Sequence, residues 1–378
     1  MANNLYTVDS IQSLDPREFT RLRPQVYRGD TTYSTQLLIE IVSNAIDEYK
    51  AGHGDKIEII VDTKQNLYQV RDYAQGFLVN SLRPDGKTIL QASFDTLNTS
   101  GKFSDDGVYE GIALGLNGIG GKLANFLAHE LIVTTYRDGQ SETDYFKEGI
   151  FQNRVVNKTN EFNGTLVKWI PSEEFFTYPA VEFSRVRKLL HVLSCLCVGL
   201  TIELIVDGQK EVYYSENGLN DLINDEIGDT ELINTRFNMT FNKGRNKMDM
   251  VMTYTSKYSL NMISYVNTGE TDSGPHITQI KTILTREFNK FFKEKKWLKE
   301  KDENLSGDDI QEGLCIAFNI TAPGVAYDAQ TKSRITKLDM APFTAAIVEN
   351  LNDWFIIAEK DIKLIFDKAT AARKAREA

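Results

Sequence analysis

The chain has 378 residues, of which 41% are hydrophobic and 25% are charged, proportions that exclude a disordered or fibrous protein. Its length exceeds that of a typical single core, so we expect two domains. The net charge of −10 argues against a general nucleic-acid coat, although a local DNA contact stays possible. We find no apolar run near the roughly 20 residues of a membrane span, no secretory signal and no disulfide framework among the three cysteines. These features predict a soluble cytoplasmic protein with no membrane partner.

The first half of the chain alternates between helix and strand patterns. "SLDPREFTRLRP" predicts a short capped helix, and residues 32–55 predict the clearest helix, which Gly52 and Gly54 end. "KIEIIVD" and "LYQVRDY" then alternate around a turn, which is typical of a hairpin. Further strands are expected at 130–137, 144–149 and 164–171, followed by a helix at 183–197 and strands at 200–208 and 210–216. Cys195 and Cys197 lie in an apolar stretch and are interpreted as small core residues.

The second half starts after residues 217–229, where Gly, Asn and Asp interrupt the pattern, and we expect a domain boundary near residue 218. Strand patterns and a long helix follow, then a strand, a loop at 324–334 and helices to the end. Both halves therefore predict the α+β class, with helices packed on mainly antiparallel sheets.

The helix at 32–55 carries three polar residues on one face. Glu40, Asn44 and Asp47 follow the spacing i, i+4, i+7, on the face opposite the apolar stripe. A solvated helix surface would show the same pattern. Asparagine is, however, a poor choice in an exposed helix interior, whereas its amide oxygen is a suitable ligand for Mg²⁺ and a nearby glutamate can polarise a water.

Other segments carry weaker signals of the same kind. Asp72 ends a strand and is followed by Gly76, so it either accepts a hydrogen bond from an exocyclic amine or closes a turn. Lys102 in "SGKFSDDG" is either a phosphate contact or part of a solvated turn. Thr165 in "NGTLVKW" either lies in a site or simply favours a strand.

The stretch "LGLNGIGGKLANFLAHE", residues 114–130, places four glycines directly before an amphipathic helix. Glycine allows sharp turns and close backbone approach, and a helix N-terminus favours phosphate. This stretch is therefore a candidate phosphate-binding loop.

In their order along the chain, these motifs resemble the ATPase portion of type IIA DNA topoisomerase B subunits, the gyrase B and topoisomerase IV ParE group of the GHKL ATPase superfamily. The resemblance covers nearly the whole chain. It rests on "RPQVYRGD", "IEIVSNAIDEYKAGH", "SGKFSDD", "LGLNGIG", "GTLVKWIPS", "DSGPHITQIKTILTREFN", "LSGDDIQEGL", "AQTKSR" and "KATAARKAREA". It implies a GHKL (Bergerat) α/β sandwich with an N-terminal dimerisation arm at 1–218, and a transducer domain with a ribosomal S5-like fold and a long C-terminal helix at 219–378.

The resemblance also implies roles for individual residues. Glu40 would be the general base, Asn44 would bind the Mg²⁺ of ATP, and Asp72, with Thr165 and Gly76, would hold the adenine. Lys332, with Gln330, would reach the γ-phosphate from the second domain. The remaining implied nucleotide contacts are Lys102, Tyr109, Gly115, Leu116, Asn117, Gly118, Ile119 and Gly120.

The partners that the resemblance implies are a second protomer on ATP binding, an A-type topoisomerase subunit and a DNA duplex that passes through the closed gate. Tyr6 or Tyr27 would meet the opposite nucleotide site. The chain shows neither a TOPRIM motif in the right context nor a cleavage module, so we expect a fragment that cannot cleave DNA by itself.

Two departures from the family pattern stand beside the adenine site. The family's "DNGRG" is "DYAQG" here, so Ala74 replaces a glycine and Gln75 replaces an arginine that pairs with an acidic residue at the position of Glu48. Two alternative functions stay open, a MutL-like ATPase and a non-hydrolysing nucleotide-binding or DNA-mimic module.

Overall fold

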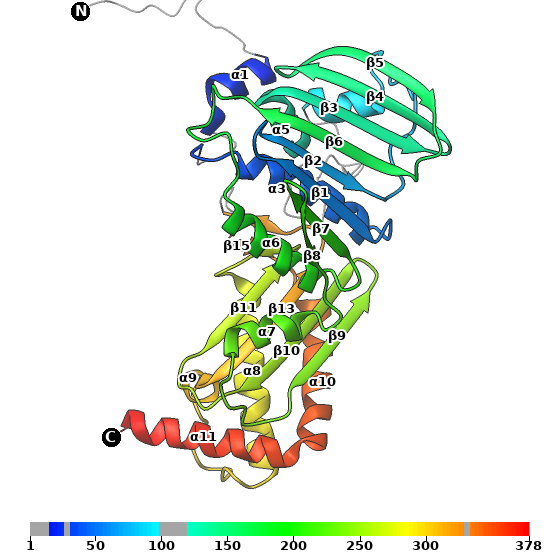
Figure 1. Cartoon of the computed structure of the whole chain (residues 1–378). Helices are drawn as coiled ribbons and strands as arrows, with labels where there is room; N and C mark the ends of the chain where they lie inside the picture. Colours follow the sequence, from blue (N-terminus) through cyan, green and yellow to red (C-terminus); the bar gives the residue numbers. More distant parts are fainter. Residues whose placement is uncertain (1–14, 26–30, 98–118, 329–332, 378) are drawn as a thin grey trace, which may run out of the picture. The chain divides into compact units, whose positions relative to one another are not determined.

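The chain forms two compact units in the computed structural model (Figure 1). The structure describes residues 15–25, 31–97, 119–328 and 333–377. Of these, the first unit contains the residues up to 190 together with 200–213, and the second unit contains the rest. The second unit therefore includes 191–199 and 214–218, which precede the boundary expected near residue 218. Within the described residues, no helix combines the length and the apolar character needed to span a membrane.

The first unit contains an eight-stranded sheet with the order β5-β4-β3-β6-β2-β1-β7-β8. Its neighbouring strands are antiparallel except for the parallel pair β1 and β7, as the sequence predicted. In sheet order the strands are Ile150–Lys158, Gln140–Lys147, Ala128–Arg137, Gly164–Pro171, Leu67–Asp72, Lys56–Asp62, Thr201–Val206 and Gln209–Tyr213. The predicted hairpin is confirmed as β1 and β2.

Helices pack against this sheet. The central helix α3 contacts β2 and α5, and α5 in turn contacts β3 and β6. The predicted capped helix is confirmed as α1, where the Asp15 carboxylate accepts hydrogen bonds from the first backbone N–H groups. The helices named in this unit are α1 (Pro16–Leu22), α3 (Thr35–Lys50), α4 (Ile89–Asp95) and α5 (Gly120–Phe126), and α6 (Phe183–Leu196) leads from it into the second unit.

The apolar stripe of α3 forms the centre of the first core. Leu37 and Ile46 are fully buried, and the other members of the stripe are at most 4% exposed. Each leucine, isoleucine and valine of the stripe contributes about 1.5–3 kcal/mol by leaving water. The periodicity that predicted the helix therefore also fixes which face is packed against the sheet.

The second unit contains a five-stranded sheet with the order β12-β11-β13-β10-β9 and a small pair, β14 and β15. Strands β11 and β13 are parallel and the other neighbours are antiparallel. In chain order the strands are β9 (Phe237–Lys243), β10 (Asn246–Tyr254), β11 (Asn261–Val266), β12 (Gly269–Glu270), β13 (Leu314–Thr321), β14 (Ala326–Tyr327) and β15 (Ile335–Lys337).

Helices and aromatic side chains fill the core of the second unit. The Phe288 ring on α8 lies 4.8 Å from that of Phe355 on α10, and the Phe292 ring lies 4.9 Å from that of Phe366 on α11. These rings pack with buried methionines of β10. The helices of this unit are α7 (Leu219–Ile227), α8 (Pro275–Glu294), α9 (Gly307–Gln311), α10 (Ala341–Ile357) and α11 (Glu359–Glu377).

Several elements differ from the sequence expectation, among them β12, α9 and β15, which were not expected, and β14, which lies in the expected loop at 324–334. Residues 217–229 were expected to interrupt the pattern, but the structure forms helix α7 between Gly218 and Gly228, both of which have positive φ angles. Strand β5 was not expected because its residues are mostly exposed and do not alternate. Helix α4 was not expected either, and its N-cap hydrogen bond from Gln91 to Thr88 stabilises it. Cys195 and Cys197 are buried free thiols, as predicted.

Candidate nucleotide site

The polar face of α3 is packed inside the first unit. Glu40 is 1% exposed and Asp47 is 6% exposed, so the alternative of a solvated helix surface is wrong for both. Gln36, one turn earlier, donates a hydrogen bond of 2.9 Å to Oε1 of Glu40. A carboxylate buried this deeply normally needs partners, which indicates a specialised environment.

The first residue of α5 lies directly against this carboxylate. A Cβ atom built on Gly120 would stand 2.3 Å from Oε2 and 3.0 Å from Cβ of Glu40, closer than atoms can approach. Glycine at this position therefore brings backbone, and not a side chain, to Glu40. The end of the glycine-rich stretch and the expected general base are thus neighbours.

Asn44 lies one turn beyond Glu40 on α3. Its side chain is partly exposed, and it makes no hydrogen bond with the residues that the structure describes. An amide oxygen in this setting fits a hard cation such as Mg²⁺, which prefers oxygen ligands and retains water. Across the described ranges, no group of three or more His, Cys, Asp or Glu side chains is arranged to hold a metal ion.

Asp72 ends strand β2 and faces the helix layer. Strand periodicity places it on the same face as Val70 and Tyr68, whose side chains are buried. Its Oδ1 accepts hydrogen bonds from the backbone N–H groups of Ala74, at 3.1 Å, and Thr165, at 3.0 Å. Thr165 on β6 therefore supports Asp72 through its main chain.

Burial raises the pKa of Asp72 to about 6. The two N–H donors and the guanidinium of Arg71 lower this pKa, whereas the carboxylate of Glu48 on α3 raises it further. Because the charged form remains the major one at pH 7, Asp72 can accept a hydrogen bond from an exocyclic amine there.

Gly76 and Gly164 hold the backbone around Asp72. Gly76 has φ +70°, and a Cβ atom there would stand 2.5 Å from the carbonyl oxygen of Tyr136. Gly164 has φ +137°, and a Cβ atom would stand 2.2 Å from the carbonyl oxygen of Asp72. Close packing of the neighbouring strands therefore requires glycine at both positions. The backbone that Gly76 approaches closely is that of Tyr136 in the same chain.

Sequence reasoning assigned no role to Gly164 or Gln36. The "NG" turn before Thr165 was a signal for Gly164, because only glycine readily adopts such φ values. The i, i+4 spacing between Gln36 and Glu40 was a signal for Gln36.

The departures from the family pattern also lie here. Ala74 is buried and contributes its backbone N–H to Asp72, whereas Gln75 is exposed. Among the influences on the pKa of Asp72, burial is the largest and the carboxylate of Glu48, which also raises it, is the smallest.

The glycine-rich stretch is described only at its end. Ile119 is half-buried at the N-cap of α5, and Gly120 begins the helix. The predicted site residues that lie outside the described ranges are Tyr6, Tyr27, Lys102, Tyr109, Gly115, Leu116, Asn117, Gly118, Gln330 and Lys332.

Comparison with known sequences identifies similar proteins. A family model described as DNA gyrase B matches residues 218–378. The chain is 32% identical to the B-type subunit of DNA topoisomerase 4 from Bacillus subtilis (strain 168), over 99% of this chain and 58% of that protein. It is 30% identical to the B-type subunit of DNA gyrase from Enterococcus faecalis, over 98% of this chain and 59% of that protein. The chain thus spans somewhat more than half the length of these relatives.

Solved structures show the same fold. The 43K ATPase domain of Thermus thermophilus gyrase B matches with a TM-score of 0.79 and 24% identity, over 96% of this chain and 97% of that one. The ATPase region of Saccharomyces cerevisiae topoisomerase II matches with a TM-score of 0.65 and 18% identity, over 93% of this chain and 99% of that one. The predicted α+β fold class, with two successive units of helices packed on mainly antiparallel sheets, is confirmed.

Proposed function

We propose that the chain, which is similar to gyrase B and topoisomerase IV B subunits, belongs to their family and binds and hydrolyses ATP as the ATP-driven part of a type IIA DNA topoisomerase. The observation that carries the proposal is the buried carboxylate of Glu40 against the backbone of Gly120. It supports a general base placed at the start of a phosphate-binding helix.

The site residues of the first unit would each have a separate role in ATP binding and hydrolysis. Glu40, oriented by Gln36, accepts the proton of the attacking water. Asp72 in its charged form accepts a hydrogen bond from the adenine amine. The N–H groups of the glycine-rich stretch position the phosphates, which is the main requirement of phosphoryl transfer. Asn44 would hold a Mg²⁺ ion, which neutralises phosphate charge when bound.

We propose that residues 1–218 form the ATP-binding domain and that 219–378 form the transducer. Lys332 and Gln330 would reach the γ-phosphate and so report the nucleotide state to the transducer. ATP binding would close two protomers into a gate, with an A-type subunit and a DNA duplex as the further partners. The expected transition from monomer to dimer with a non-hydrolysable ATP analogue can be measured by light scattering.

The substitution Glu40→Ala tests the central assignment. We expect hydrolysis to fall by at least about 100-fold, because general-base catalysis contributes on this scale, while binding of a non-hydrolysable ATP analogue stays within about threefold. Phosphate release and calorimetry measure the two quantities, with Glu161→Ala at an exposed loop position as the control.

Near-normal turnover in Glu40→Ala would remove Glu40 from the role of general base. ATP binding without turnover in the unsubstituted chain would favour the non-hydrolysing binding module instead.

A further inference from the structure

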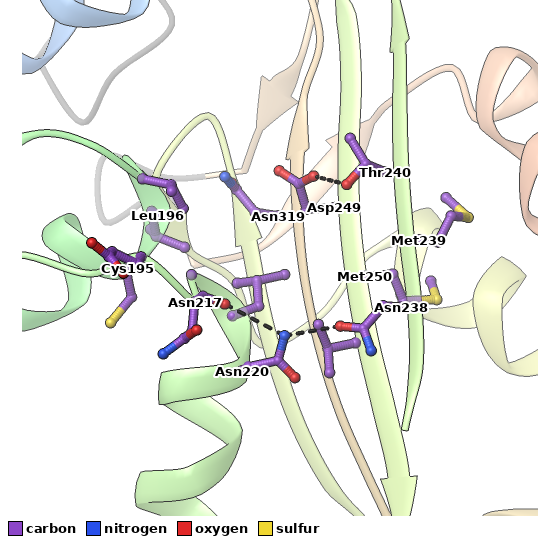
Figure 2. Close-up of a pocket in the computed structure, with 15 residues that line it drawn as sticks. Cys195, Leu196, Asn217, Asn220, Asn238, Met239, Thr240, Asp249, Met250 and Asn319 are labelled. Atoms are coloured by element: carbon purple, nitrogen blue, oxygen red, sulfur yellow. Dashed lines mark hydrogen bonds between the residues drawn. The ribbon is translucent and has the colours of Figure 1, made fainter. Parts of the chain in front are cut away.

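A cavity of about 410 Å³ lies in the second unit, and none of its lining residues is assigned to the nucleotide site (Figure 2). Its walls come from the end of α6, from residues 216–220 at the start of α7, and from strands β9, β10 and β13. All the lining residues belong to the second unit. The volume is within the usual range for small-molecule sites.

The floor of this cavity is a row of polar side chains across three strands. Thr240 on β9 pairs with Asp249 on β10, which pairs with Asn319 on β13. Because partners in register share a face, the three side chains lie side by side. Figure 2 shows Thr240 and Asp249 joined by a hydrogen bond, in which the hydroxyl donates to Oδ1 over 2.9 Å. The alternate residues Met250 and Phe318 point to the aromatic core.

Asn319 is the unusual member of this row. It is 7% exposed, and its buried Oδ1 has no hydrogen-bond donor among the described residues. Buried acceptors without donors are uncommon and costly. The neighbouring Asp249 is also an acceptor when ionised. Two adjacent side chains therefore both offer acceptors, and a ligand that supplies N–H donors complements them.

The charge of the lining indicates the sign of such a ligand. Asp249 and Glu216 line the cavity, and the lining contains no lysine, arginine or histidine among the described residues. Arg236 donates hydrogen bonds to the side chains of Asn220 and Asn224, which are neutral and leave its positive charge in place. The two carboxylates of the lining outnumber this one neighbouring charge, so the lining favours a cation.

The rest of the lining indicates which shape of ligand fits the cavity. Asn220 donates to Asn238 over 2.9 Å and to the carbonyl oxygen of Asn217, so the amides at this wall satisfy one another. Leu196 and Val251 supply apolar surface. A ligand with one donor-rich charged end and a short apolar stem matches both parts.

We propose that this cavity binds a small organic cation, a guanidinium or primary ammonium group on a short alkyl stem. The head group hydrogen-bonds to Asp249 and Asn319, and the stem packs against Leu196 and Val251. This site is separate from the proposed ATPase chemistry and does not depend on it.

The test uses the full chain without nucleotide and two probes of matched shape, butylguanidinium and neutral butylurea. Calorimetry and ligand-observed NMR measure binding to the unsubstituted protein and to Asp249→Asn, Asn319→Leu and Glu349→Gln. The last variant removes a carboxylate from an exposed position of α10 and is the matched control. Thermal melting confirms that each variant is folded.

We expect saturable binding of butylguanidinium with one site per chain, and at least about tenfold weaker binding of butylurea. Asp249→Asn and Asn319→Leu should each weaken butylguanidinium binding by about tenfold or more, and Glu349→Gln should leave it unchanged. Asn319→Leu also removes the buried acceptor, so a folded variant that still binds normally would overturn the proposal. Equal binding of the two probes, an unaffected Asp249→Asn, or no saturable binding would overturn it as well.

Discussion

Helices α3 and α8 are the central helices of the two units, and each carries an asparagine in its interior. In α8, Asn289 exchanges two hydrogen bonds with the backbone of Leu305, at 2.8 and 2.9 Å, and donates to Thr285. In α3, Asn44 makes no hydrogen bond with the described residues. An amide that is satisfied within the chain stabilises the fold, whereas one left open at a partly exposed position is available to an external partner. This difference in hydrogen bonding distinguishes a polar side chain that stabilises the fold from one that is a candidate for ligand binding.

The largest effect should come from placing a side chain between α3 and α5. In Gly120→Ala, the new Cβ would displace the carboxylate of Glu40, which stands 2.3 Å from it. We expect ATP turnover to fall by about 100-fold, because the general base leaves its position. Phosphate release measures this loss.

Gly121→Ala is the matched control for that substitution. Its Cβ would contact the ring of Phe94 at 3.2 Å and would not approach Glu40. Gly121→Ala should lower the melting temperature, and its effect on ATP turnover should be smaller than that of Gly120→Ala. Equal turnover in the two variants would contradict a specific role for the contact between Gly120 and Glu40.

The two asparagines allow a direct test of the comparison. Asn289→Ala leaves the N–H and C=O groups of Leu305 without partners, so we expect a loss of about 2–3 kcal/mol in the free energy of unfolding. Asn44→Ala should change it by less than about 0.5 kcal/mol, since alanine favours helices, but should weaken Mg²⁺-dependent nucleotide binding. Urea denaturation and calorimetry measure the two effects. A large loss of stability in Asn44→Ala would mean that Asn44 is structural.

The sequence predicted much of the fold from periodicity. The stripe of α3, the hairpin of β1 and β2 and the long helix α8 all follow from regular spacing of apolar residues. Periodicity failed for β5, whose residues are exposed, and for α7, where Gly218 and Gly228 were interpreted as a break although they flank a helix.

The site was predicted less completely. A helical wheel places Glu40 opposite the apolar stripe, and so it cannot show that α5 packs over this residue. The contact of Gly164 with Asp72 likewise depends on strand pairing between β2 and β6, which local pattern does not encode. The sequence could identify only the residue types that suit the chemistry. Their burial and mutual contacts depend on long-range packing.

The pH dependence of nucleotide binding should follow Asp72. Its pKa is raised to about 6 from 3.8, so the folded protein takes up a proton as the pH falls through 6 while the unfolded chain does not. This group therefore makes folding less favourable as the pH rises from about 4 to about 6, and Asp72→Asn removes that slope.

Below pH 6, the protonated carboxyl loses the charge that accepts the adenine amine. We expect the affinity of the wild type for ATP to fall by up to about tenfold per pH unit there. Asp72→Asn should bind more weakly at pH 7 and show only the pH dependence of ATP itself. Calorimetry from about pH 5 to about pH 7, one unit on either side of the Asp72 pKa of about 6, compares them. Parallel profiles for the two proteins would show that Asp72 does not contact the base.

The smallest effect concerns "LSGDDIQEGL" in the second unit, which forms a capping box. The Ser306 hydroxyl accepts from the N–H of Asp309 at 3.2 Å, and Asp309 accepts from the N–H of Ser306 at 2.8 Å. Arg376 on α11 donates to both side chains. Burial acts to raise the pKa of Asp309, but the bonds from Arg376 and Ser306 outweigh it and lower this pKa.

Ser306→Ala removes one cap and one partner of Arg376, so we expect a loss of about 1 kcal/mol in the free energy of unfolding, with Ser306→Thr retaining most of it. Urea denaturation at pH 7 measures both. Because Asp309 is 1% exposed and keeps its bonds to Arg376, the loss should stay well below that of Asn289→Ala. An equal loss in the two variants would mean that the capping hydroxyl of Ser306 stabilises this unit as much as the buried amide of Asn289.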